Sequence, residues 1–135
     1  MNIKTFHFKA VIIITIIMIT AFSCTNEKAQ LKVACVLPAT VSFSKNIMPI
    51  FNANCNLSGC HTGATHAGNL NLEPSVAYSQ LLQSRTGYVD TLNPQSCILY
   101  SKLISESDAM PPGGRLDDCT INLILEWIQQ KAKNN

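Results

Sequence analysis

Two cysteines and a histidine stand close together in the stretch FNANCNLSGCHTG, residues 51–63. They are Cys55, Cys60 and His61, so the spacing is C-x4-C-H. A cysteine pair followed directly by histidine, as C-x-x-C-H, is typical of covalent attachment of a c-type haem. Two thiols can form thioethers with two vinyl groups, and an imidazole after the second thiol falls beneath the iron. The two extra residues require a bulged loop, for which Gly59 gives the backbone the freedom.

A haem iron bound by His61 has a sixth position, and Met110 is the candidate to fill it. Met110 precedes two prolines in AMPPGG, so its thioether would be held on a stiff loop. His/Met ligation raises the reduction potential of a haem relative to ligation by two histidines. A methionine in a turn can instead fill the core, and an open position would suit a five-coordinate peroxidase or sensor. His66 is close to His61 in sequence, which makes reaching the opposite haem face difficult, and we interpret it as a loop residue.

The N-terminus predicts export. Lys4 and Lys9 precede an apolar run, residues 10–22, that is shorter than the roughly 20 residues of a spanning helix. This pattern is typical of a signal peptide, residues 1–23, although a permanent anchor helix is the alternative. Cys24, directly after the run, resembles the cleavage site of a bacterial lipoprotein. It would then be lipidated and tether the protein to a membrane on the periplasmic or cell-surface side.

The remaining chain is one small and nearly neutral domain. The sequence has 10 Lys and Arg against 8 Asp and Glu, and the excess lies in the predicted signal. There is therefore no electrostatic argument for binding nucleic acid. We expect residues 24–40 to form a tether that runs into an extended segment, which joins the domain near Cys35, and we expect the domain itself over residues 41–135. No arrangement of Ser, His and Asp or of paired carboxylates indicates a hydrolase.

The spacing of apolar residues predicts an all-α domain of about four helices with long irregular loops. No segment alternates with the period of a strand. The predicted helices cover residues 47–54, 75–84, 94–106 and 117–133. The last has the strongest pattern, with an apolar stripe, acidic residues at its start and lysines at its end.

Four segments in order, IMPIFNANCNLSGCH, AGNLNL, AMPPGGRL and ILEWI, resemble the small cytochrome c-type domains found in exported and lipoprotein-like chains of Bacteroidetes and planctomycetes. The resemblance covers residues 41–133. It implies a class I cytochrome c fold around one covalent haem c. It also implies that Cys55 and Cys60 carry the thioethers, His61 is the proximal ligand and Met110 the distal ligand.

The resemblance further implies a disulfide between Cys35 and Cys119, with Cys97 free and buried. The sequence alone also leaves open a bond between Cys97 and Cys119. Two readings without haem compete. One is a zinc site made by Cys55, Cys60, His61 and His66, although neighbouring Cys60 and His61 cannot easily share a tetrahedron. The other is a binding or structural lipoprotein with a disulfide between Cys55 and Cys60.

These observations together predict an exported monohaem cytochrome that carries single electrons between redox partner proteins. Such a protein holds the iron, tunes its potential and exposes a haem edge, without catalysing a bond-making reaction.

Overall fold

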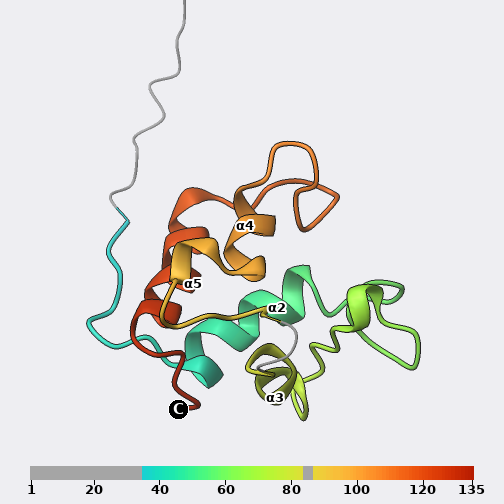
Figure 1. Cartoon of the computed structure of the whole chain (residues 1–135), viewed down its shortest axis with the longest axis horizontal. Helices are drawn as coiled ribbons and strands as arrows, with labels where there is room; N and C mark the ends of the chain where they lie inside the picture. The colour runs from blue at the N-terminus through green and yellow to red at the C-terminus, as the bar shows by residue number, and fades with distance from the viewer. Residues whose placement is uncertain (1–34, 84–86) are drawn as a thin grey trace, which may run out of the picture. The chain divides into compact units, whose positions relative to one another are not determined.

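The computed structural model describes residues 35–83 and 87–135. Within these ranges the chain is helical and contains no strand, which confirms the all-α prediction. Long loops join the helices (Figure 1). The α-helices of the described part are α2 (Met48–Asn54), α3 (Ala77–Leu81), α4 (Ile98–Ile104) and α5 (Asp118–Gln129). The predicted signal peptide, residues 1–23, and Cys24 lie outside the described residues.

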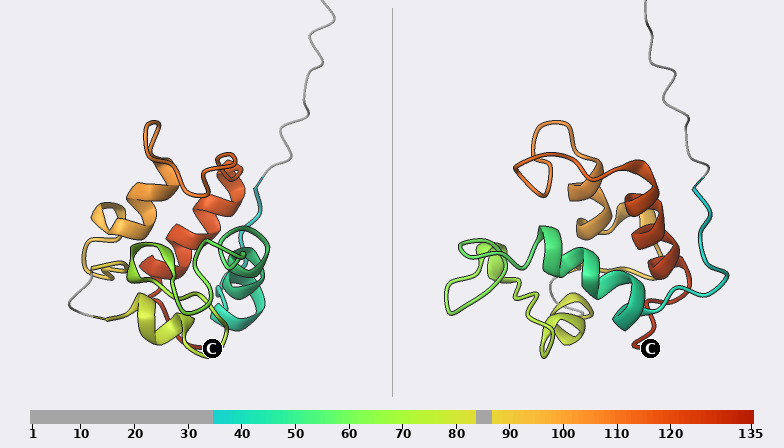
Figure 2. Two further views of the ribbon diagram at one scale, coloured as in Figure 1. Left: turned by 90° about the vertical axis from the view of Figure 1, so that its right-hand side faces the viewer. Right: turned by 180° about the vertical axis from the view of Figure 1, so that it is seen from behind.

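The first helix starts earlier than predicted. A π-helical turn, η1 (Phe43–Ile47), runs directly into α2, and Figure 2 shows the two as one continuous helical segment. Ser42 caps η1, because its side chain accepts a hydrogen bond from the backbone N–H of Lys45 at 3.2 Å. Pro49 stands at the start of α2, directly after its junction with η1.

Two predicted helices are shorter in the structure. The segment predicted over residues 75–84 contains α3 alone, and its last residue lies outside the described ranges. The segment predicted over residues 94–106 divides into a 3-10 turn, η3 (Pro94–Ser96), and α4. Cys97 between them is extended, with φ −69° and ψ 153°, and this conformation prevents a continuous helix.

The last helix, α5, ends before the lysines that were predicted to close it. The Asp117 carboxylate caps its start by accepting from the backbone N–H of Thr120 at 3.0 Å. Lys131 and Ala132 have φ of 72° and 45°, so the chain turns away after Gln130. The backbone N–H of Ala132 bonds to the Trp127 carbonyl at 2.9 Å and closes this turn. Lys131 and Lys133 therefore follow the helix and do not stand in its last turn.

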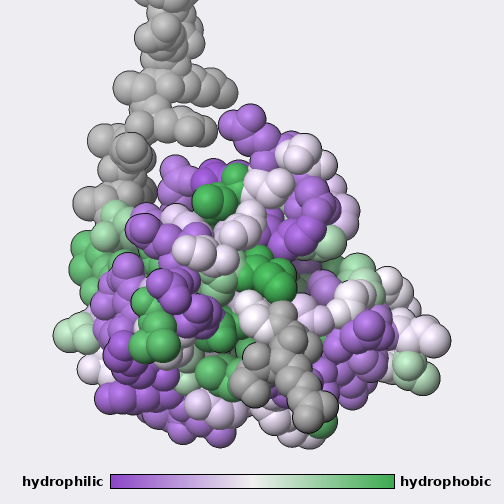
Figure 3. All heavy atoms as spheres, viewed as in Figure 1, coloured by the Kyte–Doolittle hydropathy of each residue, from purple (hydrophilic) through white to green (hydrophobic). Residues whose placement is uncertain are grey.

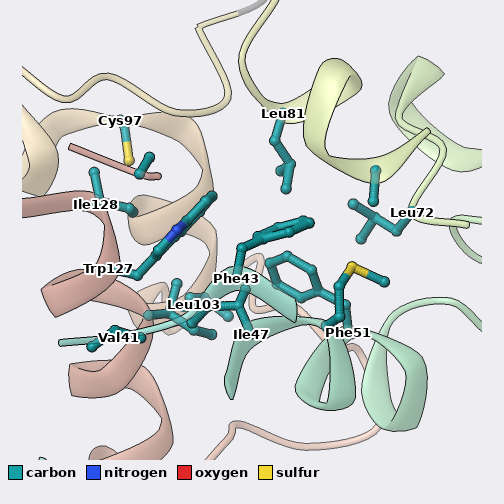
Figure 4. Packing of buried hydrophobic residues seen from close by; sticks show 14 of the residues in the cluster. Val41, Phe43, Ile47, Phe51, Leu72, Leu81, Cys97, Leu103, Trp127 and Ile128 are labelled. Carbon is teal, nitrogen blue, oxygen red and sulfur yellow. The ribbon is translucent and has the colours of Figure 1, made fainter. Parts of the chain in front are cut away.

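Trp127 lies at the centre of the core and is fully buried. Its ring is 5.2 Å from that of Phe43, and the Phe43 ring is 5.2 Å from that of Tyr78. Figure 4 shows Phe43 and Phe51 between Trp127 and Leu72. The core thus joins η1 and α2 to α5, the longest helix of the described part.

The extended segment before η1 is fixed to both ends of α5. Cys35 is disulfide-bonded to Cys119 in the first turn of α5. At the other end, the side chain of Gln130 accepts from the backbone N–H of Val41 at 2.9 Å and donates to the Ala39 carbonyl at 3.2 Å. Residues 35–41 are therefore attached to α5 at both ends, which agrees with the extended segment expected to join the domain near Cys35.

The surface is mostly polar on the face drawn in Figure 3, where apolar residues form separate patches. Helices long and apolar enough to cross a membrane are absent from the described ranges.

Candidate functional site

The domain contains an apolar pocket of about 330 Å³. This volume is within the range of small-molecule and cofactor sites. Cys55, Cys60, His61 and Met110 all line the pocket, so the structure brings together four residues chosen from the sequence for their chemistry. Its walls also include side chains of the hydrophobic core, namely Phe51, Leu70, Leu72 and Leu103.

Cys55 and Cys60 are positioned by the end of α2 and the turn that follows it. The backbone N–H of Cys55 bonds to the Phe51 carbonyl at 2.8 Å, which continues the pattern of α2. The N–H of Cys60 bonds to the Leu57 carbonyl at 2.9 Å and closes a tight turn, in which Gly59 has φ +79°. This turn accommodates the two extra residues of the C-x4-C-H spacing.

Both thiols are free and half-buried. Burial, followed by the charge of nearby Cys60, raises the pKa of Cys55 from 9.0 to about 11. The Cys55 thiol therefore remains protonated at neutral pH. A nucleophilic cysteine needs a lowered pKa, so the surroundings of Cys55 do not favour a role as a catalytic nucleophile.

The imidazole of His61 is held in one orientation. Its Nδ1 is 3.1 Å from the Leu70 carbonyl oxygen, and because that oxygen can only accept, Nδ1 carries the hydrogen. The lone pair is then on Nε2. Histidines that bind metals commonly donate their other ring N–H to a carbonyl in this way. The backbone N–H of Leu72 also bonds to the His61 carbonyl at 2.8 Å, so the loop is fixed on both sides of the ring.

Glu73 closes the loop between His61 and Leu72, a role that sequence reasoning missed. Its Oε1 accepts from the Thr62 hydroxyl at 2.8 Å and from the Gly63 backbone N–H at 3.1 Å. Together with Asn71, these hydrogen bonds hold the pKa of Glu73 below its ordinary value of 4.5. Its position eleven residues after Thr62 gives no local signal of the contact.

Met110 reaches the pocket from the loop between α4 and α5, residues 105–117. Its backbone N–H bonds to the Lys102 carbonyl at 3.0 Å, which fixes the loop to the last turn of α4. Lys102 and Asp108 form an ion pair beside this contact. Pro111 and Pro112 also line the pocket. The thioether is thus carried by a segment with backbone and side-chain attachments to α4.

The other candidate residues lie away from the pocket. His66 Nδ1 is 3.0 Å from the Gly63 carbonyl oxygen, and His66 does not line the pocket. Cys35 and Cys119 are bonded to each other, while Cys97 is free and buried. The alternative bond between Cys97 and Cys119 is therefore not formed.

The four side chains considered for zinc do not form a metal-binding group. Among residues 35–83 and 87–135, there is no cluster of three or more His, Cys, Asp or Glu that could hold a metal ion. His61 and Met110 remain available as two single donors on the pocket wall.

No protein-family model, curated protein or solved structure matches this chain.

The residues of the pocket suit a large apolar ligand that needs few polar contacts. The wall offers two thiols, one imidazole nitrogen and one thioether, set among aliphatic and aromatic side chains. Glu73, whose role depends on charge, stabilises a loop and does not line the pocket.

Proposed function

We propose that this chain is an exported monohaem c-type cytochrome that carries single electrons, with a fold of the class I cytochrome c kind. The observation that carries the proposal is that Cys55, Cys60, His61 and Met110 line one apolar pocket. These residues come from segments up to 55 positions apart, so sequence spacing alone does not require them to meet.

The residues present fit a covalently bound haem. Each thiol, of Cys55 and of Cys60, would add across one vinyl group, its sulfur bonding to one carbon and its hydrogen passing to the other. This step consumes no oxidant or reductant. His61 would supply Nε2 as the proximal ligand, because Nδ1 donates to the Leu70 carbonyl. Met110 would supply the distal thioether. A haem bound here provides the one-electron couple of its iron.

The protein's part in electron transfer is to exclude water and fix the two axial donors. Phe51, Leu70 and Leu72 are buried and form part of the pocket wall, which provides an apolar setting. Axial ligand identity and burial are the main means by which a protein tunes a haem potential. No titratable group on the wall is arranged as a nucleophile with a base, so we propose an electron carrier that serves redox partner proteins.

The experiment that tests this proposal is a pyridine haemochrome spectrum together with the intact mass of protein made in a host that matures c-type cytochromes. A mass increase of one haem that survives denaturation is expected. The position of the α band distinguishes two thioethers from one. Cys55→Ala and Cys60→Ala should each change that position, and Cys97→Ala is the matched control because Cys97 does not line the pocket.

An unmodified mass without a Soret band would contradict the proposal. The remaining reading would then be a haem-free lipoprotein stabilised by the bond between Cys35 and Cys119.

The proposal also includes export and attachment to a membrane through lipidated Cys24. Replacing Cys24 with Ser should release the protein from the membrane fraction and leave haem attachment unchanged. A Cys24→Ser protein that stays in the membrane fraction would favour the alternative of an N-terminal anchor helix.

A further inference from the structure

Lys102 is the one charged residue among those that line the pocket in the described part of the chain. It stands in the last turn of α4, and its side chain is 41% exposed. The other titratable residues on the wall are Cys55, Cys60, His61 and Tyr88, and no Asp or Glu is among them. A ligand with a carboxylate would therefore meet a cation without meeting a carboxylate of the wall.

The ion pair with Asp108 leaves Lys102 able to bind a second anion. The ammonium group of lysine has three donors and no acceptor. Asp108 itself does not line the pocket, and its side chain is 59% exposed. One donor can thus point to Asp108 while others remain for a ligand. The amide of Asn54 and the hydroxyl of Tyr88 are further polar groups on the wall, but each already donates to a backbone carbonyl.

We propose that Lys102 anchors a carboxylate of the pocket's ligand and that, resting on the proposed function, this carboxylate is a haem propionate. An apolar pocket with one cation at a partly exposed position matches an amphiphile whose apolar body is buried and whose acid group reaches towards water. An ion pair of this partly screened kind fixes orientation more than it adds affinity. Lys102 is accordingly a positioning residue for the ligand.

The test uses the haem-loaded protein and the propionate bending band of its resonance Raman spectrum, which responds to contacts of the carboxylate. Lys102→Met keeps an apolar stem but removes the cation, and we expect the band to shift. Lys102→Arg restores a cation and should return the band towards the wild-type position. Lys45→Met is the matched control, because Lys45 is exposed on η1 and does not line the pocket.

Asp108→Asn separates this role from a purely structural one. If Lys102 acts only by holding the loop through Asp108, both Asp108→Asn and Lys102→Met should shift the band alike, and the inference is overturned. If Lys102 binds the propionate, Asp108→Asn should retain the contact. An unchanged band in Lys102→Met would also overturn the inference while the attached haem still supports the proposed function. Absence of attached haem in the wild-type protein would instead reject both.

Discussion

Met110 is the residue on which the reduction potential of the proposed haem depends most directly. Met110→Ala should leave haem covalently attached, because the proposed thioethers are made by Cys55 and Cys60. It should lower the reduction potential, since a His/Met pair raises it, and the ferric spectrum should become high-spin. Spectroelectrochemistry measures both effects. Met48→Leu is the control, because Met48 is buried in the core and does not line the pocket. An unaltered spectrum in Met110→Ala would mean that another residue is the distal ligand.

Glu73 should make the stability of the domain depend on pH. Its pKa in the folded protein lies below 4.5, chiefly through the Thr62 hydroxyl and then the Gly63 N–H and Asn71. A carboxylate with a lowered folded pKa stabilises the fold above its unfolded pKa, and this contribution is lost as the pH falls through the folded value. Glu73→Gln should therefore lower the free energy of unfolding at neutral pH and approach the wild type in acid.

Urea unfolding at neutral pH and at an acid pH well below the folded pKa of Glu73 measures this difference. Asp90 and Asp117 also have lowered pKa values, but both remain in the variant, so the comparison isolates Glu73. Glu106→Gln serves as the control, because Glu106 is exposed and lies far from the loop in sequence. If the free energies of unfolding of wild type and Glu73→Gln differed by the same amount at both pH values, the titration of Glu73 could not be the cause of the difference.

At this scale the sequence identifies donors better than the groups that orient them. Cys55, Cys60, His61 and Met110 could be selected because few residue types have their chemistry. The partner of His61 is the backbone carbonyl of Leu70, which any residue could supply. The contact between Thr62 and Glu73 depends on how the intervening loop folds. Neither pairing leaves a pattern in the sequence.

Among the elements, α5 and the extended segment before η1 should depend on the disulfide between Cys35 and Cys119. The bond spans 84 positions, and the chain-entropy relation gives about 4.5 kcal/mol for a loop of this size. Cys35→Ser should lower the free energy of unfolding by up to about this amount, as measured by urea denaturation. Haem attachment should persist in Cys35→Ser, because Cys35 does not line the pocket.

Reductant provides the control for this prediction. Dithiothreitol should destabilise the wild-type protein to the level of Cys35→Ser and should not destabilise Cys35→Ser further. If dithiothreitol also lowered the free energy of unfolding of Cys35→Ser, the reductant would be acting on something other than the bond between Cys35 and Cys119.

The helical elements were predicted in number and order, while their ends were less accessible to sequence reasoning. The apolar stripe predicted for α5 marks the side that faces the core: three of its members, Ile121, Ile124 and Ile128, are buried, and the fourth, Leu125, is half-buried. Its end differs because closure depends on the positive φ of Lys131 and Ala132, neither of which is a glycine. Similarly, the extended conformation of Cys97 divides η3 from α4. These conformations are set by packing, which local preference does not reveal.

For the whole molecule, the pocket and the hydrophobic core are continuous. Phe51, Leu70, Leu72 and Leu103 belong to both, so one face of the core borders the pocket. The other side of the core, around Phe43 and Trp127, is packed by protein side chains (Figure 4). A ligand in the pocket would thus complete the core on one side only.

This division predicts unequal effects of haem on local stability. A ligand that binds the folded protein and not the unfolded chain stabilises the fold, but local opening can remain easier where apolar contacts are missing. Hydrogen exchange should therefore show that haem strongly slows exchange at His61, Leu72 and Met110, whose N–H groups bond within or beside the pocket wall. Exchange in the middle of α5 should slow less, because Trp127 packs on Phe43 without the ligand.

The comparison uses the haem-loaded protein and the same chain made in a host that cannot attach haem. Mass spectrometry of peptides from residues 55–72 and 98–112 reports the pocket, and peptides from α5 report the packed side of the core. Uniform slowing throughout the domain would mean that the haem-free chain unfolds as one unit, and that the core around Trp127 does not form independently. Slowing confined to the pocket peptides would instead show that α5, η1 and α2 make a stable frame first, onto which the loops bearing His61 and Met110 close when haem is attached.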